Sequence, residues 1–159
     1  MIIKHPENHP TAELEPHANL GVVHRGYGSF KGSRGLGDPD VGAGFRATIL
    51  VMDPGFIPKL NNSAGITFGV DLMSCRFGCK DDFSIWTPVG LNWSFYLTDD
   101  WSVFADGGVL LRSDSFYHGA YGDFFGMIGG RYHFSDRAAL TMRVGYPFVS
   151  VGVSFYVGE

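Results

Sequence analysis

Five isolated charged residues are the side chains of this 159-residue chain best placed to do chemistry. They stand among small polar residues and not in charged runs, and they are Arg46, Asp71, Asp106, Arg131 and Arg143. Guanidinium and carboxylate groups form charge-assisted, bidentate hydrogen bonds, and each is costly to bury alone. The five lie at similar distances from the nearest turn signal, so we predict that they meet at one level of the fold and neutralise one another. The alternative is that the same groups form a path for protons or ions.

The N-terminal histidines offer a second possible chemistry. His5, His9 and His17 could bind a metal, but the surrounding prolines and glutamates favour neither a strand nor an amphipathic helix. We therefore predict that residues 1–18 form a flexible solvated tail and that residues 19–159 form the folded domain.

Two cysteines lie in one short predicted loop, as Cys75 and Cys79. This spacing fits a small disulfide loop in an oxidising compartment. Free thiols and a metal site remain alternatives, although no second pair of ligands at matching spacing lies nearby.

The elements that must position the charges are β-strands. Around a polar turn at Asp99 and Asp100, residues 93–98 and 101–106 alternate between apolar and polar side chains, the period of two that is typical of a β-hairpin. The same period recurs along the chain, and no helical period is found. The predicted strands cover residues 20–31, 41–52, 64–74, 83–98, 101–112, 124–134, a seventh around 140–144, and 149–157.

Eight antiparallel strands with short connections close most simply into an up-and-down barrel, which has no open edges. A lipocalin-like carrier would point its apolar face inward and need an exterior rich in Lys and Glu, whereas a membrane barrel has the reverse arrangement. The polar face here contains Gly, Ser, Thr, Asn and Tyr with few charges. We therefore predict an all-β, eight-stranded transmembrane barrel whose interior is filled by polar side chains, and we keep the soluble carrier as an alternative.

Aromatic residues concentrate at the short-turn ends of the predicted strands, as in the interfacial girdle of a membrane barrel. The predicted girdle consists of Trp93, Tyr96, Trp101, Tyr132, Phe134, Phe155 and Tyr156.

Composition excludes other classes of protein. The net charge is −4 and no cluster of Lys and Arg occurs, so binding to nucleic acid has no electrostatic basis. No apolar run is long enough for a membrane-spanning helix. The N-terminus has no apolar core of a signal peptide, and we expect the chain to be the mature form of an exported protein. No cofactor or metal is expected.

The segment Leu97–Gly108 and the alternation from Val149 to Val157 resemble the small eight-stranded outer-membrane barrels of Gram-negative bacteria, the OmpX-like and OmpA transmembrane-domain-like group. The resemblance covers roughly residues 20–157. It implies periplasmic termini, short periplasmic turns at residues 99–100 and 135–137, contact with outer-membrane lipid, and insertion by the barrel-assembly machinery. The chain departs from the family at its end, where Val-Gly-Glu follows the last aromatic residues.

An enzyme is not expected. Lipid A deacylases of similar size use a His-Ser-Asn context that is absent here, and a pair formed by His133 with Ser154 or Asp136 is less plausible than a hydrogen-bonding histidine. The favoured function is a structural or interaction role through the outer loops, with Tyr117, His118 and Tyr121 as contact candidates. The alternative is a narrow or lateral conduit for a small hydrophobic solute, opening where Pro88 interrupts its strand.

Overall fold

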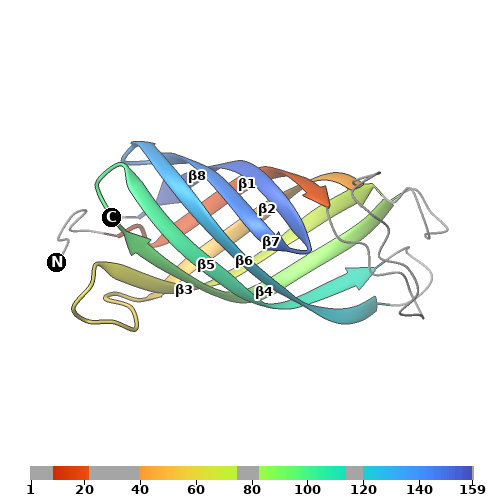
Figure 1. The fold of residues 1–159 in the computed structure, drawn as a ribbon, viewed down its shortest axis with the longest axis horizontal. Coiled ribbons are helices and arrows are strands. Elements are labelled where there is room, and N and C mark those ends of the chain that lie inside the picture. Colours follow the sequence, from red (N-terminus) through yellow and green to blue (C-terminus); the bar gives the residue numbers. More distant parts are fainter. Residues whose placement is uncertain (1–8, 22–39, 75–82, 114–119, 159) are drawn as a thin grey trace.

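The computed structural model describes residues 9–21, 40–74, 83–113 and 120–158, and these residues form a closed barrel of eight antiparallel strands. Each strand pairs with the next along the chain, and β1 pairs with β8 to close the ring (Figure 1). The strands are β1 Ala12–Gly21, β2 Asp40–Met52, β3 Asn62–Ser74, β4 Phe83–Tyr96, β5 Trp101–Ser113, β6 Ala120–Ser135, β7 Ala138–Tyr146 and β8 Phe148–Val157. The predicted fold class and strand number are confirmed. No helix in the described ranges has the length and apolar character needed to cross a membrane.

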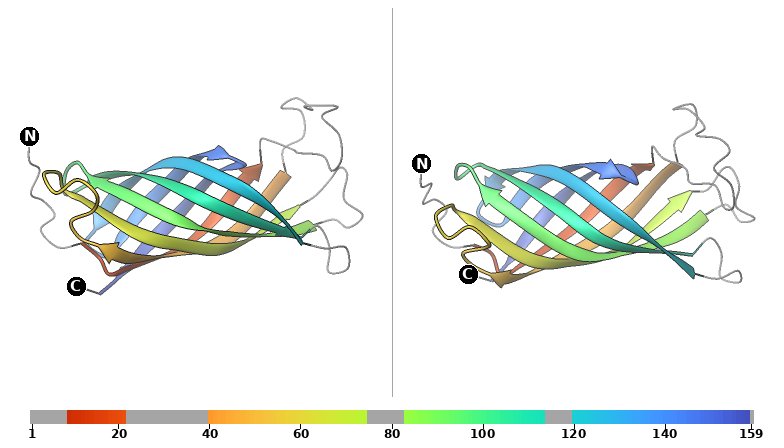
Figure 2. Two further views of the ribbon diagram at one scale, coloured as in Figure 1. Left: turned by 90° about the horizontal axis from the view of Figure 1, so that it is seen from below. Right: turned by 60° about the horizontal axis from the view of Figure 1, so that its bottom comes forward.

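The two ends of the barrel differ. At one end, which we call the turn end, β1 begins, β8 finishes, and the chain connects β2 to β3, β4 to β5 and β6 to β7 (Figures 1 and 2). At the opposite end, the loop end, residues 22–39, 75–82 and 114–119 join the remaining strands, apart from the short β7–β8 link at Pro147. Those three segments, and with them Cys75, Cys79, Tyr117 and His118, lie outside the described residues.

The first strand begins earlier than predicted. Residues 12–18 belong to β1, so the predicted boundary between a tail of residues 1–18 and a barrel of residues 19–159 is wrong for this segment. Leu14 and Leu20 face outward while Glu13 and Glu15 are buried, which is the strand period. Pro16 is tolerated because it faces outward and interrupts the ladder to β8 only locally. Polar content and proline concealed the strand.

The outer surface of the barrel is apolar and its interior holds the charges. Along β5, for example, Trp101 and Val103 are exposed, whereas Ser102, Phe104 and Asp106 are buried. Large apolar side chains elsewhere on the wall reach 59% exposure at Leu91 and 65% at Ile128. This polarity is the reverse of what a lipocalin-like carrier requires, and that alternative is therefore wrong.

The interior is not polar throughout. Near the loop end, inward-facing side chains form what we call the apolar cluster: Met73, Trp86, Leu110, Phe125, Met127 and Phe148. Leu110 and Met73 have no exposed surface. The expectation of an interior filled by polar side chains therefore holds for the middle and the turn end of the barrel, while apolar packing fills the part nearest the loop end.

Candidate functional site

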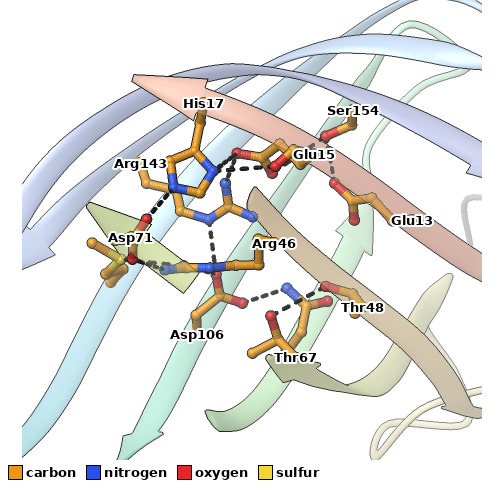
Figure 3. Close-up of polar contacts among 12 residues, drawn as sticks. Glu13, Glu15, His17, Arg46, Thr48, Thr67, Asp71, Asp106, Arg143 and Ser154 are labelled. Carbon is orange, nitrogen blue, oxygen red and sulfur yellow. Dashed lines mark hydrogen bonds and ion pairs between the residues drawn. The ribbon is translucent and has the colours of Figure 1, made fainter. Parts of the chain in front are cut away.

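All five charged residues singled out in the sequence lie inside the barrel and are almost fully buried, with exposures of 0–4%. Four of them join two residues of β1 in what we call the charged cluster: Glu15, His17, Arg46, Asp71, Asp106 and Arg143 (Figure 3). The fifth, Arg131, lies one step closer to the turn end and pairs with Glu13. Ion pairs thus join four of the five residues, together with Glu15 and His17 of β1, whereas Arg131 stands apart from the single level that the sequence predicted.

Arg143 links two carboxylates from opposite parts of the sequence. Its Nε donates to Asp106 Oδ2 at 2.9 Å, and its Nη1 donates to Glu15 Oε1. Asp106 also accepts a hydrogen bond from Asn92 Nδ2 at 2.5 Å, and the guanidinium carbon lies 4.8 Å from the centre of the Phe104 ring. Both carboxylates thus have partners, as buried charges require.

Arg131 makes the bidentate pair that the sequence suggested for Arg and Asp, but its partner is Glu13. Its Nε and Nη2 donate to the two carboxylate oxygens at 2.9 and 2.6 Å, and its Nη1 donates to Ser94 at 3.0 Å. The Ser154 hydroxyl donates to the same carboxylate at 2.5 Å, and its oxygen also lies 3.4 Å from Glu15 Oε2. Ser154 therefore connects this pair to the charged cluster.

His17 joins Asp71 to β1. Its Nε2 lies 2.6 Å from Asp71 Oδ1, and its Nδ1 lies 3.2 Å from the carbonyl oxygen of Glu15. Both oxygens only accept hydrogen bonds, so a ring nitrogen that carries a proton donates to the oxygen it faces. Asn19 supports the arrangement by donating to Asp71 at 2.8 Å.

The buried charges of the described residues come close to balance. They comprise three guanidinium groups, from Arg46, Arg131 and Arg143, and four carboxylates, from Glu13, Glu15, Asp71 and Asp106. Such a balance lowers the electrostatic cost of holding the groups in a medium of low dielectric constant.

Arg46 lies at the boundary between the charged and the apolar clusters. Its ion pairs are long, at 3.6 Å to Asp71 and 3.8 Å to Asp106, and its Nη1 contacts the sulfur of Met127 at 3.7 Å. The guanidinium carbon lies 5.8 Å from the centre of the Phe125 ring. The side chain thus separates the hydrogen-bonded middle of the lumen from the apolar packing above it.

A small cavity of about 30 Å³ opens beside the Arg131–Glu13 pair at the turn end. Its lining includes Ser94, Tyr96 and Tyr156. This volume has room for roughly two water molecules.

Two members of the predicted aromatic girdle do not face outward. Tyr96 is only 8% exposed and stacks on His9, with 4.1 Å between ring centres, and Tyr156 stacks on His133 inside the turn end. Both residues occupy strand positions of inward parity, so alternation overrides their aromatic character. The remaining five, Trp93, Trp101, Tyr132, Phe134 and Phe155, lie on the outer face.

Within the described ranges, His9 and His17 do not share a metal site. His9 lies at the turn end and pairs with Asp53 at 2.8 Å, His17 lies in the charged cluster, and His5 is outside the described residues. No group of three metal-binding side chains occurs in the described part of the chain. His133, considered with Ser154 or Asp136 as a hydrolytic pair, instead contacts Ser102 Oγ at 2.8 Å.

Reasoning from sequence missed Glu13, Glu15 and His17 entirely as lumen residues. Their signal was the alternation with Leu14, Ala18 and Leu20, which shows the same period as the other strands.

Two further residues named in the sequence analysis lie on strands. Tyr121, a predicted contact residue, lies on β6. Pro88, the predicted point of lateral opening, is fully buried and paired with Leu110 on β5.

Comparisons with known proteins identify the fold. No protein-family model matches the chain, and no curated protein sequence matches it either. A designed transmembrane β-barrel aligns with 94% of this chain and 98% of its own, with a TM-score of 0.63 and 15% sequence identity. The outer membrane protein Ail of Yersinia pestis, in a phospholipid bilayer nanodisc, aligns with 89% of this chain and 97% of its own, with a TM-score of 0.46 and 9% identity.

Fold and interior together define the class: a small eight-stranded antiparallel barrel that is apolar outside and charged inside, with the fold of a transmembrane β-barrel. The designed barrel shares this fold over nearly its whole length.

Proposed function

We propose that this protein spans the bacterial outer membrane as a closed barrel and acts through the segments at its loop end. The observation that carries the proposal is the inverted polarity of the wall, with Arg143 and Asp106 buried inside and Leu91 and Ile128 exposed outside. Strands of 9 to 16 residues are long enough, because a tilted transmembrane strand needs about 9–11. An apolar surface of this extent is stable only in contact with lipid or detergent.

The outward aromatic residues near the turn end support the same proposal. Trp101, Tyr132 and Phe134 are 53%, 42% and 57% exposed, and the rings of Trp101 and Tyr132 lie 5.0 Å apart. Trp and Tyr are favoured where the acyl chains meet the headgroups. With Trp93 and Phe155, they would form an interfacial girdle at the periplasmic side, where the barrel-assembly machinery delivers such chains.

The lumen is best explained as a structural plug. The apolar cluster fills the part near the loop end, the charged cluster fills the middle, and a cavity of about 30 Å³ lies near the turn end. Such an interior leaves the outer segments as the parts able to bind a partner. Tyr117, His118 and Tyr121 are the candidate contacts for an extracellular or envelope component.

Folding in micelles tests the membrane proposal directly. The protein should show β-rich far-ultraviolet circular dichroism and heat-modifiable gel migration only when micelles or vesicles are present. Exchange of residues 114–119 for a Gly/Ser segment of the same length should then change partner binding while heat modifiability is retained. A monodisperse β-protein in buffer without detergent would refute the proposal.

A lateral conduit for a small hydrophobic solute is the second candidate, favoured by one observation. The β3–β4 ladder lacks pairs between Phe68 and Asp71, opposite Pro88, and the apolar cluster residue Trp86 lies beside this gap. A solute could enter by this route only if the packed side chains of the apolar cluster moved apart. Uptake of a fluorescent hydrophobic probe into protein-containing vesicles should rise in a Leu110→Ala variant if this route exists, and unchanged uptake would exclude it.

A further inference from the structure

The connection between β2 and β3 at the turn end differs from the other turns at that end. Residues 53–61 expose three large apolar side chains, with Phe56 at 53%, Ile57 at 36% and Leu60 at 39% (Figure 1, the olive-yellow loop). The β4–β5 connection, residues 97–100, exposes one large apolar side chain, Leu97 at 44%, beside Asp99 and Asp100. An exposed apolar group on an ordered connection indicates a contact surface and not a solvated turn.

One buried side chain fixes the conformation of this connection. Asn62, with no exposed surface, donates through Nδ2 to the carbonyl oxygens of Ile57 at 2.7 Å and Leu60 at 2.8 Å. Backbone hydrogen bonds run from Gly55 N to Asn62 O at 2.8 Å and from Leu60 N to Ile57 O at 3.0 Å. These backbone groups therefore do not need water as a partner, which is the condition for a loop to enter an environment poor in water.

The loop continues the outer wall of the barrel. The Phe56 ring makes an edge-to-face contact with Trp93, with 5.4 Å between ring centres, and Trp93 lies 4.6 Å from Phe95 on the outward face of β4. The indole Nε1 of Trp93 donates to Asn62 Oδ1 at 3.0 Å. The apolar surface thus runs from the strand wall onto the loop without a polar break.

We propose that residues 53–61 anchor the turn end of the barrel in the bilayer interface. Phe56, Ile57 and Leu60 contact the acyl chains at the headgroup boundary, and the ammonium of Lys59 reaches the lipid phosphates, as interfacial lysines do. Continuity with the wall through Trp93 favours lipid over a soluble partner or a second copy, because whatever covers the wall also covers the loop. This inference rests on the proposed membrane location of the barrel.

Site-directed spin labelling in phosphatidylcholine–phosphatidylglycerol vesicles tests the anchor. In a Cys75→Ser/Cys79→Ser background, single variants Ile57→Cys, Leu91→Cys and Asp136→Cys place a nitroxide on the loop, on the strand wall and on the exposed β6–β7 turn. Power saturation then compares the accessibility of each label to oxygen, which concentrates in lipid, and to a water-soluble nickel complex. A label at Leu60→Cys serves if the first loop variant does not fold.

The expected result is an oxygen-to-nickel accessibility ratio at position 57 severalfold above that at 136 and approaching that at 91. A ratio at 57 equal to that at 136, with 91 still in lipid, would overturn the anchor and leave the membrane barrel intact. Nickel accessibility at 91 as high as at 136 would overturn both proposals. Spin–spin broadening at 57 that disappears on dilution with unlabelled protein would show that a second copy covers the loop, and would also overturn the anchor.

Discussion

Replacement of Arg143 by Met should destabilise the barrel by about 3 kcal/mol, near the lower limit of the cost of breaking a buried ion pair. Met fills much of the same volume with an apolar chain, so the change isolates the guanidinium group. The side chain of Arg143 is 1% exposed and serves both Glu15 and Asp106. Removing it leaves an excess of negative charge inside the lumen.

The lower limit applies because neither carboxylate loses every partner. Asp106 keeps Asn92 at 2.5 Å, and Glu15 keeps the hydroxyl of Ser154 at 3.4 Å. A second substitution, Glu15→Gln, removes one of the stranded charges and should restore part of the loss. The double-mutant cycle should show a coupling of about 0.5–3 kcal/mol, as expected for side chains in direct contact.

Guanidinium unfolding in phospholipid vesicles, followed by tryptophan fluorescence, measures these differences. Arg137→Met is the matched control, because Arg137 lies exposed on the β6–β7 turn, and it should change the free energy of unfolding by less than about 0.5 kcal/mol. A loss below about 1 kcal/mol for Arg143→Met would place the pair among solvated surface ion pairs. The lumen would then be wet at this level, and the structural plug would be refuted.

Three further predictions concern packing and closure. Gly44→Ala should lower the free energy of unfolding by about 1–3 kcal/mol, because its Cβ would collide with the charged cluster. Gly126→Ala, with nothing within 4 Å of its Cβ, should be neutral or slightly stabilising in the same unfolding assay. Leu110→Ala, inside the apolar cluster, should cost about 2–5 kcal/mol, and Leu111→Ala on the outer wall should cost clearly less; equal losses would contradict the assigned faces. Deletion of residues 1–18 should abolish heat-modifiable migration, because β1 closes the barrel, and a deletion variant that still folds would contradict this closure.

The sequence predicted the strands where alternation was strong and unambiguous. Ile66, Phe68 and Val70 on β3 face outward as their period requires. The same period puts Phe125 and Met127 on the inner face of β6 with Arg131. Phe125 and Met127 lie in the apolar cluster and Arg131 lies nearer the turn end, and this difference in level depends on side chains from other strands. The alternation within one strand does not predict which side chains from other strands lie at each level of the lumen.

β1 escaped prediction for a different reason. Its inward glutamates resemble those of a solvated tail until their partners are known, and Glu13 pairs with Arg131 while Glu15 pairs with Arg143, at separations of 118 and 128 residues. Contacts of such range leave no local trace in the sequence. Tyr96 and Tyr156, which were predicted for the aromatic girdle but lie on the inner face, show that residue type is a weaker guide than strand parity.

The location of these glutamates on β1 couples the pairing of buried charges to the closure of the barrel. Arg131 and Arg143 belong to β6 and β7, and their carboxylate partners arrive on β1, the strand that must meet β8 to close the ring. An open sheet would therefore hold both cations without these glutamates, leaving Asp106 of β5 as the carboxylate beside Arg143. Ring closure therefore completes the charge compensation, so a half-assembled barrel is penalised electrostatically as well as by its free edges.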